Sequence, residues 1–172
     1  MKQLAQFEDD IWEKQQPLIL RNTVRAIAFR DDGKFAFLHI KGEDEFGKRN
    51  HLETIGGGIE VNESMVEAMK REIMEEIGYT CEVLDEIGVV VDTYHLIHRK
   101  TVSHFFVVQL LENQKATSRT ALETSLIAGI EWLSFQEAYK RLSAEVDGIN
   151  KLIHRRDLAA LEAFFQRFGI SY

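Results

Sequence analysis

Carboxylate side chains are concentrated on one predicted helical turn near the middle of the chain. Glu72, Glu75 and Glu76 lie three and four residues apart, and Arg71 comes directly before them. On an α-helix such residues are neighbours, with Cβ atoms about 5–6 Å from each other. At an effective dielectric of about 20, two unit charges about 5 Å apart repel by about 3 kcal/mol, and one arginine relieves only part of this repulsion. A divalent cation would relieve the rest, and clustered oxygen ligands are those that Mg²⁺ or Mn²⁺ prefers.

The helix that carries these carboxylates is predicted over residues 64–77. Ser64 and Glu67 have the spacing of a capping box, and Gly78 is typical of the residue after a helix end. At about 100° per residue, four apolar side chains form one predicted buried stripe: Val66, Met69, Ile73 and Ile77. The carboxylates fall beside this stripe, so we expect them to point along the protein surface toward neighbouring loops.

A run of glycines precedes the helix at a fixed distance. By itself, a charged helical face is usually solvated, and three glycines usually form a turn. Here the glycines are residues 56–58. Five residues separate Gly57 from Glu63, and seven separate Glu63 from Arg71. The joint occurrence of both features at these offsets is far more specific than either feature alone.

The segment from Gly57 to Tyr79 resembles the Nudix box, the signature of the Nudix hydrolase family. The box reads G-x5-E-x7-R-E-U-x-E-E-x-G-U, in which U is an aliphatic residue. Ile73 fills the first aliphatic position, and Tyr79 departs from the second because it is aromatic. Asn62 stands where many members have glycine, and asparagine tolerates the left-handed conformation of that turn. The resemblance covers about residues 22–142, where the predicted strands follow the layout of Nudix domains.

This resemblance implies an enzyme with a metal cofactor. Nudix hydrolases use Mg²⁺ or Mn²⁺ and an attacking water to cleave a nucleoside diphosphate linked to another moiety, X. By position, Glu72 and Glu76 are the implied metal ligands, with Glu75 sharing the metal or lying just behind it. The backbone carbonyl of Gly56 or Gly57 is a further candidate ligand, since glycine lets the backbone approach a ligand closely. The implied partner is a small-molecule nucleotide diphosphate.

The resemblance also implies supporting roles around these ligands. Arg71 would orient the glutamates through ion pairs, and Glu63 would hold Arg71 or the loop. Gly58 and Gly78 would support the loop and the end of the helix.

The general base and the substrate contacts remain open at this point. Glu72, Glu75 and Glu123 are all candidates for the base, and Glu123 belongs to a predicted loop before the last strand. Tyr94 and His51 are candidate substrate contacts. His51 stands where many family members have an aromatic residue.

The surrounding elements predict an α+β fold. Strands are expected over 23–29 and 34–40 around a turn at 31–33, then over 51–54, 81–97, 101–111 and 128–134. Exposed loops are expected over 41–50 and 112–124, and helices over 135–142 and 149–168. The last helix has an apolar stripe that we expect to dock on its own domain or to form a dimer contact: Leu161, Phe164, Phe165 and Phe168. With the resemblance, these elements predict a Nudix-type α/β/α sandwich with a mixed β-sheet and a C-terminal helix.

Length, charge and composition narrow the class of protein. A chain of 172 residues can form one domain with a sizeable core, expected over 1–172 with the Nudix core at about 22–142 and a helical extension at 148–168. The net charge of −7 argues against non-specific nucleic-acid binding. No apolar run is long enough for a membrane span, and no signal-peptide segment is evident. Cys81 is the single cysteine, so we expect a reducing, cytoplasmic location.

Two other functions fit the same resemblance. A Nudix-like module that binds a nucleotide for regulation would be favoured by loss of box glutamates, and none is lost. An enzyme like the isopentenyl-diphosphate isomerases is disfavoured, because those proteins usually carry a degraded box and a catalytic cysteine context that Cys81 does not supply.

Overall fold

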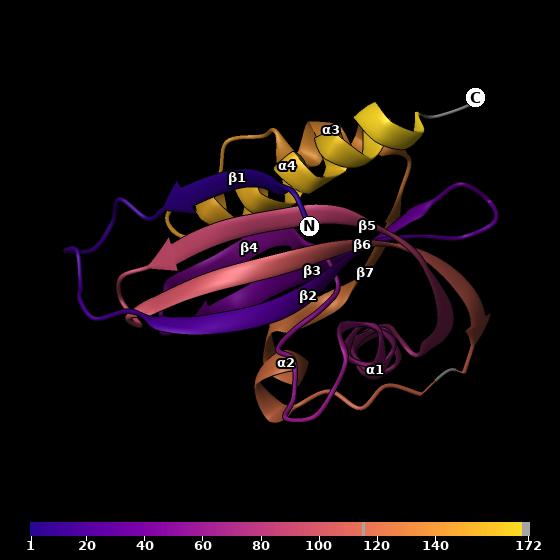
Figure 1. Cartoon of the computed structure of the whole chain (residues 1–172), viewed down its shortest axis with the longest axis horizontal. Helices are drawn as coiled ribbons and strands as arrows, with labels where there is room; N and C mark the ends of the chain where they lie inside the picture. Colours follow the sequence, from indigo (N-terminus) through magenta and orange to yellow (C-terminus); the bar gives the residue numbers. More distant parts are fainter. Residues whose placement is uncertain (115, 170–172) are drawn as a thin grey trace.

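A mixed β-sheet forms the centre of the molecule (Figure 1). The structure is a computed structural model that describes residues 1–114 and 116–169. The strands of the described part are β1 (Gln3–Glu8), β2 (Ile19–Phe29), β3 (Phe35–Asp44), β4 (Gly47–Glu53), β5 (Tyr79–Tyr94), β6 (Arg99–Asn113) and β7 (Ile127–Leu133). They lie in the order β1-β5-β6-β2-β3-β4, and β7 also pairs with β3. The pairs β1–β5 and β2–β6 are parallel and the others are antiparallel.

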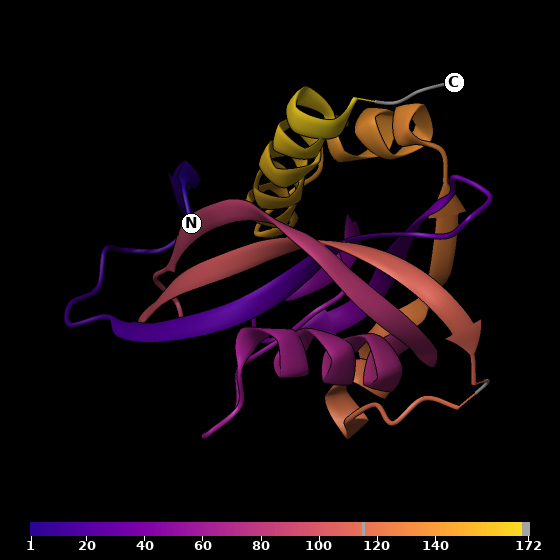
Figure 2. The same cartoon turned by 45° about the vertical axis from the view of Figure 1, so that its right-hand side comes forward.

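Helices cover both faces of the sheet (Figure 2). Helix α1 (Met65–Ile77) packs on one face, while α3 (Phe135–Leu142) and α4 (Asn150–Phe168) pack on the other. A short helix, α2 (Ala121–Leu126), precedes β7. Strand β2 serves both cores because successive side chains point to opposite faces: Val24 and Ala26 pack with α1, and Ile27 packs with α4. The predicted α+β sandwich with a mixed sheet and a C-terminal helix is confirmed.

The segment between β4 and α1 continues the sheet beside β2. Thr23 forms a bridge with Gly58 and Ala26 with Ile55, each antiparallel. β2 pairs with β3 only at its end, at Ala28 and Phe29, so this glycine-containing segment occupies the next part of that edge. The arrangement places Gly57 directly beside the Glu72 carboxylate of α1.

Most predicted elements are confirmed, including the strands, the helix with its caps, and both C-terminal helices. Asn62 has φ 66°, the left-handed conformation expected at that turn. The predicted loop at 41–50 is wrong, because β3 and β4 form a hairpin through it with pairs such as Lys41↔Asn50. Its polar composition is misleading, since backbone pairing needs no apolar side chains.

Three further expectations need correction. The predicted loop at 112–124 instead contains the end of β6 and the start of α2, and residue 115 lies outside the described residues. Val66 is 43% exposed and so does not belong to the buried stripe. On α4, Leu161 and Phe164 are buried whereas Phe165 and Phe168 are exposed by 44% and 43%, because the stripe is wider than the contact with the sheet. β1 was not predicted at all.

No helix among the described residues combines the length and apolar character that crossing a membrane demands.

Candidate active site

Helix α1 is fixed at both ends by its own sequence. The Ser64 hydroxyl accepts a hydrogen bond from the Glu67 N–H, and the Glu67 carboxylate accepts one from the Ser64 N–H at 2.9 Å. At the other end Gly78 has φ 71°, and its N–H donates to the carbonyl of Met74 at 3.0 Å. An N-cap of this kind stabilises a helix by about 1 kcal/mol. The two caps set the helix limits and therefore the direction in which its carboxylates point.

Two glutamates of α1 are buried against the glycine segment. Glu72 and Glu76 are each 5% exposed, more buried than their place beside the apolar stripe predicted. The Gly56 N–H donates to Oε2 of Glu76 at 2.8 Å. A Cβ atom on Gly57 would lie 2.5 Å from Oε1 of Glu72, inside any normal contact. Glycine at position 57 leaves the Glu72 carboxylate in this place, which a larger residue would force it to leave.

A third carboxylate joins these two from outside the helix. One ligand oxygen each from Glu72, Glu76 and Glu123 lie within 4.8 Å of one another. At an effective dielectric of about 20, each pair of charges at about 5 Å repels by about 3 kcal/mol. Hard, anionic oxygen atoms grouped in this way suit Mg²⁺ or Mn²⁺, so the donor set fits the metal that the resemblance implied.

Glu123 is positioned by its own capping box. Thr120 caps α2, its N–H donates to Oε2 of Glu123 at 2.7 Å, and the Glu123 N–H donates to the Thr120 hydroxyl at 3.3 Å. Just before this cap, the Arg119 guanidinium donates two hydrogen bonds to the carbonyl of Glu76, at 2.9 and 2.6 Å. This anchor ties α2 to the end of α1. The T-x-x-E spacing was a signal in the sequence that would have predicted α2.

Arg71 connects the carboxylates to the glycine loop. Its Nε and Nη2 bind the two oxygens of Glu63 at 2.8 and 3.0 Å, and Nη1 binds Glu72 at 2.8 Å and Glu75 at 3.1 Å. Its Nη2 also donates to the carbonyl of Gly58 at 2.8 Å. The structure thus brings together the residues expected to orient one another. Glu75 lies outside the group of three carboxylates, and its side chain is 37% exposed.

Burial controls the protonation of the inner carboxylates. It raises the pKa of Glu76 to about 8, a rise that Arg25 and the Gly56 N–H partly oppose. Burial also raises the pKa of Glu72, against the opposing effect of Arg71. By contrast, the hydrogen bond from Arg71 lowers the pKa of Glu63. Burial thus favours the protonated form of Glu72 and Glu76, whereas a cation bound beside them would favour their ionised form.

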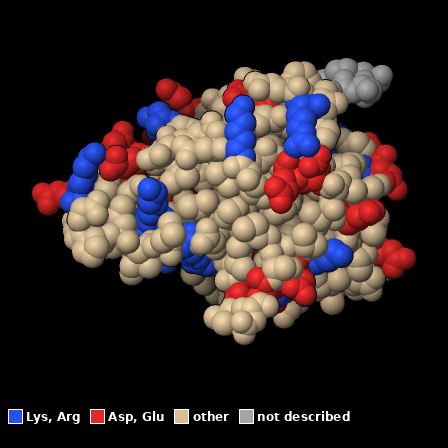
Figure 3. All heavy atoms as spheres, viewed as in Figure 1, with Lys and Arg blue, Asp and Glu red and all other residues tan. Residues whose placement is uncertain are grey.

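A hollow of about 760 Å³ opens over the cluster, between the glycine loop, α1 and α2. Its polar lining includes Arg71, Glu72, Glu75 and Glu123 together with Arg21. On the face of the molecule seen in Figure 3, acidic side chains gather at the bottom, where α1 and α2 lie in Figure 1, with basic side chains beside them. The hollow can admit a polar small molecule to the carboxylates.

The remaining candidate residues lie in two places. The carbonyl of Gly57 accepts a hydrogen bond from the Val24 N–H at 2.9 Å, which leaves the Gly56 carbonyl as the freer candidate ligand. Tyr94 and His51 are 7% and 3% exposed and lie on the face of the sheet that α4 covers. His51 is packed against His154 of α4, with ring centroids 6.2 Å apart.

Sequence reasoning missed a group of arginines on that second face. Arg21 and Arg25 of β2, Arg49 of β4, Arg99 of β6 and Arg156 of α4 line one cavity. The alternation of polar residues at 21, 23 and 25 was a weak signal, since it places charged side chains on a face that a helix covers. Their meeting depends on the docking of α4, which the sequence pattern does not specify.

Comparison with known proteins identifies the family of this chain. The NUDIX domain family matches residues 19–155. A sequence search of curated proteins found no significant match. The MutT protein from Methanosarcina mazei Go1 has a similar structure with TM-score 0.65 and 19% identity, over 89% of this chain and 98% of that one. The NUDIX hydrolase from Nitrosomonas europaea gives TM-score 0.65 and 19% identity, over 86% and 89% of the two chains.

A structure described as a UDP-X diphosphatase is also similar, with TM-score 0.60 and 19% identity, over 90% of this chain and 68% of that one. At these identities the solved structures establish a common fold. The family match spans most of the chain and includes the glycine loop, α1 and Glu123. The chain therefore belongs to the NUDIX domain family.

Proposed function

We propose that this protein is a divalent-metal-dependent pyrophosphatase that cleaves a nucleoside diphosphate linked to another moiety. The observation that carries the proposal is the group of three carboxylates within 4.8 Å at the base of a polar hollow. The Nudix family comprises hydrolases of pyrophosphate bonds, and the box residues of this chain are complete apart from Tyr79. The proposed partners are small nucleotide-like molecules, and a cytoplasmic location and a homodimer remain predictions.

The proposed metal ligands are Glu72, Glu76 and Glu123, with the Gly56 carbonyl as a fourth. When bound there, Mg²⁺ or Mn²⁺ supplies positive charge against the diphosphate and lowers the pKa of a bound water. The chain's own contribution is to position and to orient. Arg71 holds Glu72 in place, and the Gly56 N–H holds Glu76. In phosphoryl transfer, positioning and electrostatic stabilisation account for most of the catalysis.

We assign the general base to Glu75 among the three candidates. Glu75 lines the hollow but is outside the group of three carboxylates, so we do not assign it as a ligand of the cation that they would bind. One of its oxygens accepts from Arg71 at 3.1 Å, and among residues 1–114 and 116–169 the other has no hydrogen-bond partner, so it can accept a proton from water. Arg71 also limits the positions that this carboxylate can adopt.

A phosphate-release screen over nucleoside diphosphate derivatives, with Mg²⁺ and then Mn²⁺, tests the function. We expect turnover of at least one compound and its loss on addition of a chelator. Glu76→Gln should lower kcat by orders of magnitude and weaken metal binding, because it removes a proposed ligand. Glu75→Gln should lower kcat with metal affinity unchanged. Nucleotide binding without any turnover would instead support a regulatory module.

A further inference from the structure

The face of the sheet under α4 contains a cavity of about 160 Å³ lined by five arginines. This volume is roughly ten times the 10–15 Å³ that one water molecule needs. We call it the arginine pocket, defined by Arg21, Arg25, Arg49, Arg99 and Arg156. Aromatic and aliphatic side chains complete the wall: Phe46, Tyr94, Ile97, Ile149 and Ile153. The pocket therefore combines an apolar surface with an unusual density of positive charge.

The pleat and register of the sheet bring the arginines together. Residues 21, 23 and 25 of β2 point to one face because alternate side chains share a face. Arg21 pairs in register with Thr101 of the parallel strand β6, and Arg99 lies two residues before it on the same face. β4 and α4 contribute Arg49 and Arg156 from the other side of the cavity. Four separate elements thus place guanidinium groups around one space.

Acidic side chains balance only part of this charge. Glu53 binds Arg25 at 2.8 Å and Arg156 at 3.2 Å. Asp157 also binds Arg156, at 2.7 Å, and Asp44 binds Arg49 at 2.6 Å. Among residues 1–114 and 116–169, no carboxylate lies within 4.0 Å of the guanidinium nitrogens of Arg21 or Arg99. Two of the five arginines therefore have no ion-pair partner in the described part of the chain.

Unsatisfied donors point to the same need for an anion. The Nε atoms of Arg25 and Arg49 are buried and have no hydrogen-bond partner among the described residues, and Arg49 is only 8% exposed. A buried donor without a partner is unfavourable, and native proteins rarely leave one. Arg21 is exposed as a residue, yet its pKa is lowered by burial of its guanidinium and by the neighbouring charges of Arg99 and Arg25. An anion in the pocket would satisfy these donors and reduce the repulsion.

The arginine pocket adjoins the candidate active site. Arg21 and Gly57 line both the pocket and the hollow over the carboxylates. A molecule whose diphosphate lies beside Glu72 can therefore extend past Gly57 into the pocket.

We propose that the arginine pocket binds a second anionic group of the substrate, a phosphate monoester or a carboxylate separate from the diphosphate that is cleaved. This inference rests on the proposed function and specifies its substrate class. Arginine suits the role because its planar guanidinium binds phosphate and carboxylate with paired hydrogen bonds.

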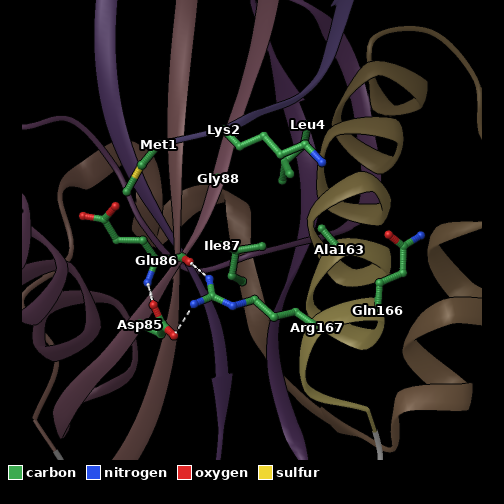
Figure 4. A pocket seen from close by; sticks show the side chains of 10 residues that line it. All are labelled: Met1, Lys2, Leu4, Asp85, Glu86, Ile87, Gly88, Ala163, Gln166 and Arg167. Atoms are coloured by element: carbon green, nitrogen blue, oxygen red, sulfur yellow. Dashed lines mark hydrogen bonds and ion pairs between the residues drawn. The ribbon is translucent and has the colours of Figure 1, made fainter.

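Another hollow of the molecule shows what a satisfied arginine looks like. Between β1, β5 and the end of α4, a hollow of about 530 Å³ contains Arg167 (Figure 4). Its Nη2 binds Asp85 at 2.7 Å and its Nη1 donates to the carbonyl of Glu86 at 2.6 Å. This arginine is paired with the protein itself and needs no ligand, so Arg167→Gln is a suitable control variant.

Matched pairs of diphosphates that differ by one anionic group test the inference. The probes are coenzyme A with dephospho-coenzyme A, NADP⁺ with NAD⁺, and UDP-glucuronate with UDP-glucose. Hydrolysis is followed with Mg²⁺, and binding of the same six compounds is measured by calorimetry so that compounds without turnover also report. In at least one pair we expect the anionic member to have a KM or Kd at least tenfold lower, which corresponds to about 1.4 kcal/mol.

Variants then test whether the arginine pocket causes the preference for the anionic member of each pair. Arg99→Gln should remove it, because Arg99 has no ion pair whose loss would disturb the fold, and Arg99→Lys should keep part of it. Arg167→Gln should leave it unchanged. Inorganic phosphate is titrated alone to separate a substrate group from a free anion.

Three outcomes would overturn the inference. The first is the absence of any tenfold preference in both hydrolysis and binding, and the second is a preference that Arg99→Gln does not alter. The third is tight, Arg99-dependent binding of inorganic phosphate with no preference within any pair, which would make the pocket a site for a free anion. If chelator-sensitive hydrolysis of neutral members persists in these cases, the proposed pyrophosphatase function stands while the substrate class is wrong.

Discussion

Replacing Gly57 with alanine should displace a proposed metal ligand without disturbing the fold. The new Cβ would lie 2.5 Å from Oε1 of Glu72 and 2.8 Å from its Oε2, whereas ordinary contacts begin at 3.4 Å. The carboxylate must therefore retreat by about 0.9 Å, the difference between 3.4 and 2.5 Å. The backbone need not move, because Gly57 does not have a positive φ and the atoms it would meet end a flexible side chain.

This displacement is large for the proposed cation. Mg²⁺ requires oxygen ligands at about 2.0–2.1 Å in near-ideal octahedral geometry. A misplacement of about 1 Å in a catalytic group can cost on the order of 100-fold in rate. We therefore expect Gly57→Ala to lower kcat/KM by about 100-fold, or about 2.7 kcal/mol of transition-state stabilisation. The free energy of unfolding of the metal-free protein should change by less than about 1 kcal/mol.

The assay compares three proteins: wild type, Gly57→Ala and Gly129→Ala. A Cβ on Gly129 would meet nothing within 4 Å, so this variant controls for a general effect of alanine in the sheet. Calorimetry gives the Mn²⁺ affinity, steady-state kinetics gives kcat/KM, and denaturant unfolding gives stability. Wild-type metal affinity and activity in Gly57→Ala would refute the reasoning. So would a loss of stability that accounts for the loss of activity.

Three further predictions concern buried charges. Burial raises the pKa of Asp92 to about 7 from 3.8, so the contribution of Asp92 to the free energy of unfolding should fall as pH rises from about 4 to 7. Asp92→Asn should remove this contribution, which amounts to at most about 4 kcal/mol, and unfolding of both proteins measured across that pH range checks it. Because the pKa of Glu76 is raised to about 8, Mg²⁺ affinity should rise with pH up to about 8, and binding of the ion should release a proton. Calorimetry in buffers of different ionisation enthalpy measures both effects, and an affinity independent of pH between 6 and 8 would contradict the prediction. Asp157 is fully buried and accepts hydrogen bonds from the Thr54 N–H at 2.7 Å and from Nε of Arg156 at 2.7 Å. Asp157→Ala should therefore lower the free energy of unfolding in denaturant by about 3–5 kcal/mol. A decrease under about 1 kcal/mol would show that the charge of Arg156 is balanced elsewhere.

Local signals explain what the sequence predicted well. The cap residues Ser64 and Gly78 act on their own helix, so the limits of α1 follow from nearby residues alone. The spacing of the box likewise reflects one continuous segment, in which Arg71 reaches Glu63 one way and Glu75 the other. Alternation and turn chemistry were enough for the β2–β3 hairpin around Gly33.

Features that depend on distant segments were not predictable in this way. β1 is held by parallel pairing with β5, more than 80 residues later, and its own pattern is weak. Glu123 reaches the other carboxylates because Arg119 anchors its segment to α1. The arginine pocket requires α4 to pack against β4 and β2, so that Arg156 meets the arginines of the sheet, and no local pattern encodes that contact.

The central claim is that Glu72, Glu76 and Glu123 together bind a divalent cation. The most direct measurement is anomalous X-ray scattering from crystals soaked in Mn²⁺ with a slowly hydrolysed nucleoside diphosphate derivative. We predict an anomalous peak in contact with carboxylate oxygens of all three residues and beside the carbonyl of Gly56. A diffraction map with the diphosphate bound in the hollow and no manganese among these glutamates would contradict the account.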